Sequence, residues 1–392
     1  MFRRRDKGGI SPLRALSASL SGTLGVGNIV GVAVAMIVGG AGAVFWIWIS
    51  ALVSMVLKYC EITLGVKYRQ KSAAGFDGGP MFYMEKGVGG KFGKFCGAVF
   101  AAAGVVSSFA MGNIVQTSAA SDAANIIFGA NEFIFGAVFA VIIGLVIFGG
   151  FDRISRVTSV VLPIMSAVYL LLSLAVIILN TGLIPSLFTR IFEEAFEFES
   201  AFGGVLGFLL SKNVSEGVAK GTFSHESGSG TAPMAHANAQ TDTPARQGLL
   251  GLFEVFADTI VICTLTAFVL LVAWEKGSEC DNGMELVLSA FGNEIGAWAE
   301  YVIGASILAF AFSTVICWAF YGKLCLSYLT KSRKAPVFYI IIYLALIAFG
   351  TLLSQEAVWH TADFGVALMT ALNLPALLLL RKEIKRETEV LF

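Results

Sequence analysis

The sequence predicts an all-α membrane protein with about ten transmembrane helices. Of its 392 residues, 56% are hydrophobic and only 14% are charged, whereas soluble domains carry about 25% charged residues. The mean hydropathy is +0.79, and apolar runs of about 20 residues, long enough to cross a bilayer, recur along the chain. We therefore expect a single transmembrane domain over residues 1–392, embedded in a lipid bilayer.

Ten apolar segments are candidate spans. They cover residues 16–38, 42–66, 95–119, 133–149, 157–180, 202–225, 248–274, 297–326, 336–353 and 363–380. The sixth and eighth segments contain polar interruptions, so their ends are the least well defined. An even number of spans places both termini on the same side of the membrane.

Basic residues gather on that side. They fill both terminal tails and the same-side connections, to which we assign Lys94, Lys220 and Arg246 among others, whereas the opposite loops carry only Arg190 and Lys276. Loops rich in lysine and arginine stay in the cytoplasm. We therefore expect a multi-pass protein of the cell membrane (plasma or inner membrane) with both termini cytoplasmic.

The first span is predicted to be broken. Gly22, Gly25, Gly27 and Gly31 all lie within it, and each glycine costs about 1 kcal/mol relative to alanine inside a helix. Irregular backbone at membrane depth is tolerated only where it is buried in protein or lines a cavity. A binding site is expected at this break.

A second break is predicted near the end of the sixth span, in G-T-F-S-H-E-S-G-S-G-T-A-P-M-A-H, at Ser224–Pro233. Five spans separate the two breaks, and an odd number inverts the topology, so we expect inverted repeats at 16–180 and 202–380. Broken segments at corresponding positions of two halves indicate a transporter site. Half-helix N-termini suit a carboxylate, and free carbonyls suit Na⁺ or an ammonium group. The alternative is close helix packing through Gly27-x-x-x-Gly31.

Two further spans carry polar faces. In the third span, Asn113, Gln116 and Thr117 are spaced i, i+3, i+4 and share a helical face, which would contact either a ligand or a neighbouring helix. The eighth span places Phe310, Ser313, Thr314 and Trp318 on one face. Two adjacent hydroxyls could serve a hard cation, which prefers oxygen ligands, and Trp318 could form a wall of a small pocket.

Charged residues within the spans are expected to be neutralised locally. Lys58 is spaced to pair with Glu61, and Lys212 with Glu216. Glu254 and Asp258 have like charge at i, i+4. Either one of them is protonated, or both accept hydrogen bonds from donors in the loop T-P-A-R-Q-G (243–248).

Several long segments together resemble the alanine/glycine:cation symporter family, also called the sodium:alanine symporters. Among them are G-V-G-N-I-V-G-V-A (25–33), K-Y-C-E-I-T-L-G-V-K-Y-R (58–69), F-S-H-E-S-G-S-G-T-A-P-M-A-H-A (223–237) and F-A-F-S-T-V-I-C-W-A-F-Y-G (310–322). The resemblance implies the amino-acid–polyamine–cation superfamily and its five-plus-five inverted-repeat fold of the leucine-transporter type.

The resemblance also implies a set of site residues. Backbone N–H groups around Gly25, Gly27 and Asn28 would meet the substrate carboxylate. Gln116, Thr314 and Trp318 would line the pocket, and the second break, with Ser227, Gly228 and Gly230, would face the ammonium end. A sodium ion would lie between the carbonyls of Ser21, Leu24 and Phe310 and the hydroxyls of Ser313 and Thr314.

The chain departs from the usual family pattern at several of these positions. Val26 stands where the family usually has threonine. In the second break the usual S-N-E-A-G-M-G is replaced by S-H-E-S-G-S-G, which places His225, Ser227 and Ser229 at the changed positions. These departures bear on the substrate and on the coupling ion.

We expect alternating-access symport of a small neutral amino acid, alanine or glycine, driven by sodium, with no cofactor beyond the coupling ion and no nucleic-acid partner. One alternative is a proton-coupled transporter, or one for a different small amino acid, on the same fold, in which His225 and Glu226 would be used first. A membrane-embedded enzyme is a second alternative, but the chain has no H-E-x-x-H, G-x-S-x-G or G-x-x-x-x-G-K-[ST] motif. An ion channel would usually need a symmetric oligomer around a filter, whereas both breaks fit one protomer.

Overall fold

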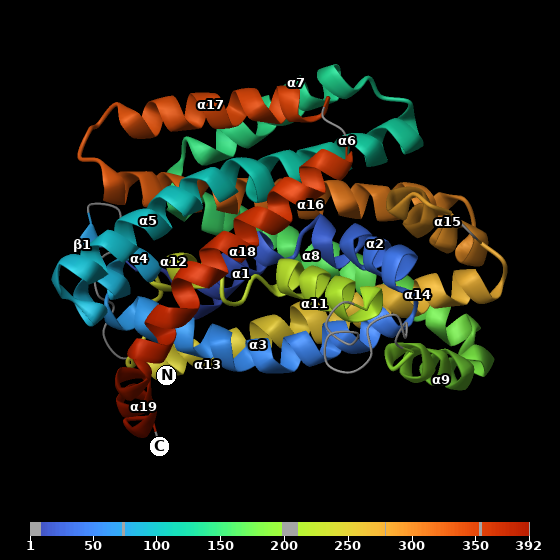
Figure 1. Cartoon of the computed structure of the whole chain (residues 1–392). Helices are drawn as coiled ribbons and strands as arrows, with labels where there is room; N and C mark the ends of the chain where they lie inside the picture. The colour runs from blue at the N-terminus through green and yellow to red at the C-terminus, as the bar shows by residue number, and fades with distance from the viewer. Residues whose placement is uncertain (1–8, 73–74, 198–210, 279, 353–354, 392) are drawn as a thin grey trace.

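The computed structural model describes residues 9–72, 75–197, 211–278, 280–352 and 355–391, and these residues form a helical bundle (Figure 1). The helices of the first half are α1 (Pro12–Thr23), α2 (Val30–Gly39), α3 (Gly42–Lys67), α4 (Pro80–Tyr83), α5 (Gly90–Phe109), α6 (Val115–Phe128), α7 (Glu132–Ile147), α8 (Gly150–Leu179) and α9 (Ile184–Ala195). Those of the second half are α11 (Lys212–His225), α12 (Ala232–His236), α13 (Pro244–Val255), α14 (Thr264–Glu275), α15 (Gly283–Ile295), α16 (Trp298–Leu329), α17 (Ala335–Gly350), α18 (Gln355–Leu379) and α19 (Arg381–Glu389).

Short irregular helices and one hairpin complete the described chain. The 3₁₀ turns are η1 (Val26–Asn28) and η4 (Thr181–Leu183), and the π-helical segments are η2 (Met84–Val88), η3 (Ala110–Ile114) and η6 (Phe256–Cys263). Strands β1 (Gln70–Ser72) and β2 (Gly75–Asp77) pair antiparallel, with Gln70 opposite Asp77.

Each of the ten predicted spans coincides with a helix or with helices joined across a break. Within the described residues, five stretches can cross a membrane alone by length and composition: α3, Gly90–Phe128, α8, Pro244–Glu275 and α16. A sixth is added if Asp363–Leu379 and α19, which are bent by 62°, count as one span, while α2, α7 and α17 are shorter apolar helices. Part of the sixth predicted span, residues 202–210, lies outside the described residues.

Four pairs of spans that lie five apart in the predicted order pack against each other. α2 packs on α11 and α1 on α12, α3 packs on α13, α5 packs on α16, and α7 packs on α17. The two broken spans, α1–α2 and α11–α12, therefore lie side by side in the bundle (Figure 1).

Three helices outside the predicted spans cover the ends of the bundle. α9 packs on α3, where Phe188 and Phe192 contact Trp48, and α15 packs between α2 and α16. α19 lies against α3 and α13. None of these helices is an apolar run of span length, which is why hydropathy alone did not predict them.

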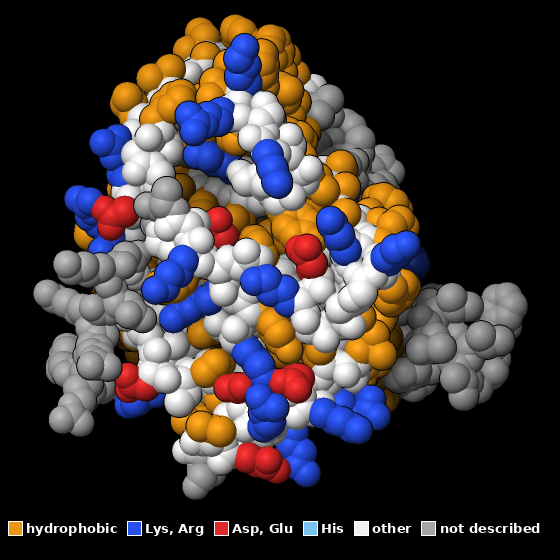
Figure 2. Space-filling view, turned by 90° about the vertical axis from the view of Figure 1, so that its left-hand side faces the viewer, with side chains coloured by type: hydrophobic (Ala, Val, Ile, Leu, Met, Phe, Trp, Pro, Cys, Tyr) orange, Lys and Arg blue, Asp and Glu red, His pale blue; other side chains and the backbone are white. Residues whose placement is uncertain are grey.

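One end of the molecule is rich in lysine and arginine (Figure 2), and both ends of the described chain lie there (Figure 1). At this end Ile10 bridges to Ala239, and Arg69 donates to the carbonyls of Ala237 and Ala239 at 2.9 and 2.6 Å. Lys67 of α3 pairs with two carboxylates of α19.

The assignment of Lys220 to a cytoplasmic connection is wrong. Lys220 is buried within α11, where its Nζ lies 2.8 Å from Oδ2 of Asp363 in α18. Because this carboxylate neutralises it, the lysine can remain inside the bundle.

Candidate functional site

The backbone of the first break is held by one side chain from within the break and one from α6. α1 ends at Thr23, and α2 begins at Val30. The Gly25 N–H donates to Asn28 Oδ1 and the Val26 N–H to Gln116 Oε1, both at 3.1 Å. A substrate carboxylate that binds the Gly25 N–H must therefore replace an internal partner.

Gly25 has no room for a side chain. A Cβ added there would lie 2.7 Å from Gln116 Oε1 and 2.8 Å from Thr314 Oγ1. The glycine thus lets the third and eighth predicted spans approach the broken backbone closely. Gly25, Gln116 and Thr314, which were predicted to share a site, are brought together.

The second break runs from Glu226 to Thr231, between α11 and α12. Glu226, with a φ of +50°, is the only non-glycine residue of the described ranges with positive φ, and Gly228 and Gly230 follow with φ of +91° and +77°. Asn373 of α18 donates to the Gly228 carbonyl at 2.9 Å. The Ser227 N–H donates to His225 Nδ1 at 3.0 Å, and the buried Ser227 hydroxyl has no hydrogen-bond partner among the described residues.

The two breaks meet at Asn28. Its Nδ2 donates to Ser224 Oγ of α11 at 2.5 Å and to Oδ1 of Asp258 in η6. Its carbonyl accepts from Thr266 Oγ1 at 3.0 Å. Gly27 faces the Phe223 ring, which an added Cβ would approach to 2.6 Å. Gly27 therefore lets the first break pack closely against Phe223 of α11, while packing through Gly27-x-x-x-Gly31 stays a prediction.

The five oxygens predicted to hold sodium converge where α1 ends beside α16. Thr314 Oγ1 donates to the Ser21 and Leu24 carbonyls at 3.0 and 3.4 Å. Ser313 Oγ donates to the Ser21 and Phe310 carbonyls at 3.4 and 2.9 Å. An all-oxygen set of carbonyls and hydroxyls fits a hard cation.

The polar side chains of the third predicted span have different partners. Gln116 reaches the first break. Asn113 Nδ2 donates to the Tyr343 carbonyl of α17 at 2.7 Å, so this residue contacts a neighbouring helix, which is one of the two alternatives that the sequence left open. Thr117 Oγ1 bonds back to the Asn113 carbonyl at 3.0 Å.

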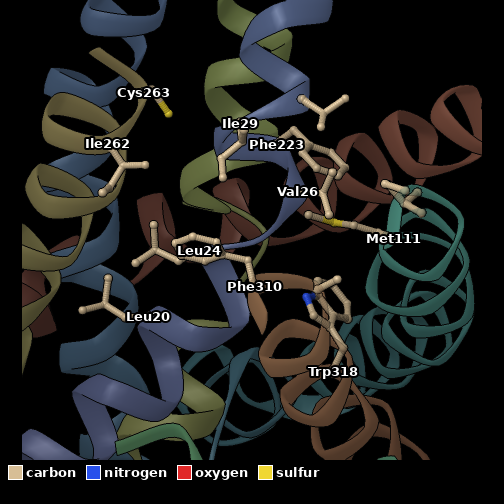
Figure 3. Close-up of a cluster of buried hydrophobic side chains, with 14 of the residues drawn as sticks. Leu20, Leu24, Val26, Ile29, Met111, Phe223, Ile262, Cys263, Phe310 and Trp318 are labelled. Atoms are coloured by element: carbon tan, nitrogen blue, oxygen red, sulfur yellow. The ribbon is translucent and has the colours of Figure 1, made fainter. Parts of the chain in front are cut away.

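Apolar side chains from four elements gather next to the first break (Figure 3). They are Val26 of η1, Met111 of η3, Phe223 of α11 and Trp318 of α16, and all four are buried. Trp318 Nε1 donates to Glu226 Oε1 at 3.0 Å, so the tryptophan also contacts the second break. Trp318 was predicted to line the site, and its contact with Glu226 was not anticipated.

A buried ion pair stands behind the second break. Lys58 Nζ lies 3.3 Å from Glu254 Oε1 and donates to the His225 carbonyl at the end of α11 at 2.6 Å. Glu254 also accepts from Ser19 Oγ at 2.9 Å and lies 3.1 Å from His236 Nε2. The lysine therefore satisfies a carbonyl that the helix end leaves free.

The predicted local pair of Lys58 with Glu61 is wrong. Glu61 instead accepts from Asn373 Nδ2 at 2.5 Å. The ion pair predicted between Lys212 and Glu216 is not found within the described ranges, and Lys212 is exposed at the first residue of α11. Neither pair forms, although the spacing of each would allow it. Glu61 binds a side chain from a distant part of the chain, and Lys212 is exposed.

The segment 243–248 was predicted to be a loop that supplies donors to Glu254 and Asp258, but α13 begins at Pro244 with Thr243 as its N-cap. Asp258 accepts from Asn28 and, at 3.1 Å, from Thr259. Gln247, in the first turn of α13, reaches this network through His236 Nδ1 at 2.7 Å.

Sequence reasoning left Glu226, Asp258 and Asn373 out of the predicted site. Glu226 lies inside the predicted second break, and Asp258 is a charged residue in an apolar span, so both carried a signal. Asn373 is a single amide in a long apolar segment, and only its position in the bundle reveals its contact with the break.

Comparison with known proteins places the chain in a family. Residues 1–391 match the sodium:alanine symporter family. Over 98% of the chain and 84% of the relative, it is 38% identical to "Sodium/alanine symporter AgcS" of Methanococcus maripaludis. It is 37% identical to "Probable sodium/glutamine symporter GlnT" of Bacillus subtilis, over 96% of the chain and 78% of the relative.

The fold is that of the leucine-transporter type. The structure superposes on the transporter MhsT, solved with L-phenylalanine, with a TM-score of 0.60 at 14% identity, over 98% of this chain and all of that one. The sequence prediction of an all-helical membrane transporter, rather than an enzyme, is confirmed. The chain belongs to the sodium:alanine symporter family, a family of sodium-coupled amino-acid symporters.

Proposed function

We propose that this protein carries a small neutral amino acid, alanine or glycine, across the cell membrane together with sodium by alternating access. The observation that carries the proposal is the convergence of the Ser21, Leu24 and Phe310 carbonyls with the hydroxyls of Ser313 and Thr314. This oxygen cluster lies next to Gly25, whose backbone is part of the first break. The relative named as a sodium/alanine symporter supports alanine.

Sodium would join the end of α1 to α16. Its ligands come from the end of α1 and from the middle of α16. Bound there, the ion would fix α1 against α16 and hold the Gly25 backbone in place for the substrate. Substrate affinity then depends on sodium, which is the basis of coupling.

The amino acid would lie between the two breaks. Its carboxylate is assigned to the N–H groups of Gly25, Gly27 and Asn28 and to Gln116, and its ammonium group to the side of Ser227, Gly228 and Gly230. Val26, Met111, Phe223 and Trp318 provide a buried apolar surface for its side chain. A small apolar side chain, as in alanine, suits these neighbours, and Val26 contributes no hydroxyl.

We also assign the two halves and the orientation. Residues 16–180 and 202–380 would be inverted repeats, a proposal supported by the mutual packing of four pairs of spans that lie five apart. The basic end (Figure 2) would face the cytoplasm with both termini. Inward opening at this end would release sodium and amino acid together.

Uptake of labelled alanine into proteoliposomes tests this function. An inward sodium gradient should drive uptake above equilibration, and replacement of sodium by choline at fixed pH should abolish it. Undiminished uptake in choline would contradict sodium coupling. If a proton gradient alone then drove accumulation, the proton-coupled alternative would replace it.

A further inference from the structure

We propose that the Glu226 carboxylate binds the ammonium group of the substrate and thereby sets the requirement for a primary amine. This inference rests on the proposed amino-acid transport. It assigns to the ammonium group a charged partner, whereas the site predicted from the sequence offered only the backbone and serine of Ser227–Gly230.

The Glu226 side chain links the second break to α16. Its Oε1 accepts from Trp318 Nε1 at 3.0 Å, and its Oε2 accepts from Thr231 Oγ1 at 2.6 Å. Trp318 in turn lies beside Val26 and Met111 (Figure 3). Because each carboxylate oxygen can accept two hydrogen bonds, both oxygens retain capacity for a further donor such as an ammonium group.

The backbone at Glu226 is unusual. Its φ of +50° is found at no other described non-glycine residue, and the neighbouring Ser229 hydroxyl and N–H both bond to the Glu226 carbonyl, at 2.5 and 3.2 Å. A side chain other than glycine in this conformation is disfavoured and persists where the surroundings impose it, commonly at ligand sites. The first residue of the second break is therefore left-handed and carries a carboxylate, where glycine would be the usual residue.

Buried charge in the described core is unbalanced. Glu61, Glu226, Glu254 and Asp258 are all buried. Lys58, the buried lysine near them, forms its ion pair with Glu254, and the other buried lysine pairs with Asp363 of α18. No described basic side chain forms an ion pair with Glu226. A buried carboxylate without a cation is costly, and a substrate ammonium group would supply one.

This arrangement predicts the ligand class. A zwitterionic amino acid brings both a carboxylate for the first break and a cation for Glu226. A hydroxy acid such as lactate keeps the carboxylate and the size of alanine but lacks the cation. The buried hydroxyl of Ser227, next in the chain and without a described partner, offers the ammonium group a second acceptor.

The test uses the purified full-length protein at saturating sodium. Wild-type protein should bind alanine and should bind lactate far more weakly. In Glu226→Gln, which keeps the size and an acceptor for Trp318, alanine affinity should fall roughly ten- to a hundredfold, the effect of losing a charge-assisted hydrogen bond. Lactate affinity should not fall, so discrimination between the two ligands should shrink by the same factor.

Control variants distinguish the loss of the Glu226 charge from an effect on folding. Glu216→Gln, on the same helix α11 and partly exposed, should leave alanine affinity at the wild-type value. Glu226→Asp, which retains the charge, should bind alanine more tightly than Glu226→Gln. Sodium affinity should stay within about twofold of wild type in Glu226→Gln, because the sodium oxygens come from α1 and α16.

Two results would overturn the proposal. One is that wild-type protein binds lactate as tightly as alanine, a comparison that needs no variant. The other is that folded Glu226→Gln binds alanine with unchanged affinity. Failure of the proposed function would look different, because wild-type protein would then show no sodium-dependent alanine binding at all.

Discussion

Thr314 shows how a single hydroxyl joins two elements. Its Oγ1 donates to the carbonyls of Ser21, in the last turn of α1, and of Leu24, just after that helix. A Cβ added to Gly25 would approach the same hydroxyl closely. These carbonyls are free because the helix ends there. The chemistry of the candidate cation site thus follows directly from the interruption of the first predicted span.

Replacement of Thr314 by valine removes this hydroxyl while nearly preserving the shape of the side chain. We expect the sodium concentration for half-maximal alanine uptake to rise about tenfold, since one oxygen ligand is lost. Alanine affinity at saturating sodium should return close to the wild-type value. Ser327→Ala on the exposed face of α16 is the matched control. An unchanged sodium dependence in Thr314→Val would exclude this residue as a ligand.

At the scale of residues, the spacing within one helix predicts a shared face but not the partner of each side chain. Ser313, Thr314 and Trp318 share a face in the continuous helix α16, as expected. Asn113 contacts α17, whereas Gln116 contacts the first break, and these partners depend on the packing of other helices. The partner of Lys58 could not be read from spacing, since Glu254 lies on a different helix, almost two hundred residues further along the chain.

At the scale of elements, the end of α11 depends on α3. Lys58 places its ammonium group on the last carbonyl of α11 and on Glu254 of α13. The three helices are thereby joined at the depth of the second break. The buried pair is a structural support for the break.

Lys58→Met should lower the free energy of unfolding by about 3–5 kcal/mol, because it leaves Glu254 as an unpaired buried charge. The double variant Lys58→Met with Glu254→Gln should recover part of this loss. Thermal unfolding of the purified protein measures both, with Lys212→Met at the exposed start of α11 as control. Equal melting temperatures for wild type and Lys58→Met would contradict a supporting role.

The C-terminal helix α19 is fastened to α3 by charge. Lys67 pairs with Glu383 and, at 3.0 Å, with Glu387, and Tyr59 bonds to Thr388 at 2.7 Å. The hydrogen bond from Lys67 lowers the pKa of Glu383 below its ordinary value of 4.5. Because its pKa is lowered, ionised Glu383 stabilises the packing of α19 on α3 at any pH above 4.5. This stabilisation is lost as the pH falls through the lowered pKa.

We therefore expect α19 to be protected from deuterium exchange at neutral pH and to lose protection only below pH 4.5. Lys67→Gln should lose that protection already at neutral pH. The same exchange profile in Lys67→Gln and wild type would show that the ion pairs do not hold the helix.

The sequence predicted those elements that contain a long apolar run or a cluster of glycines. Both breaks were located to within a few residues, because several glycines interrupt an apolar run. α9, α15 and α19 were missed because each is a short amphipathic or charged helix outside the apolar runs, whose position is decided by contacts with distant helices.

At the scale of the whole molecule, charge separates the two ends. Lysine and arginine cover the end that carries both termini (Figure 2), while Arg190 and Lys276 at the other end pair with acidic residues. The count of basic residues predicted this separation, and it erred at Lys220, whose acidic partner lies on α18.

Cysteine labelling in intact cells tests the orientation. In a variant whose six native cysteines are replaced, Lys276→Cys should react with a membrane-impermeant maleimide from outside. Lys94→Cys, at the basic end, should react only after permeabilisation. Both residues are exposed, so the reverse pattern would invert the assigned topology.

The central claim is that the two breaks and α16 form one site at which sodium and amino acid bind together. Equilibrium binding of alanine to the purified protein, measured across sodium concentrations with choline as the replacement cation, tests it most directly. Alanine affinity should rise with sodium to a plateau, and alanine should raise sodium affinity by the same factor, as thermodynamic linkage requires. Alanine binding of equal affinity with and without sodium would contradict the account.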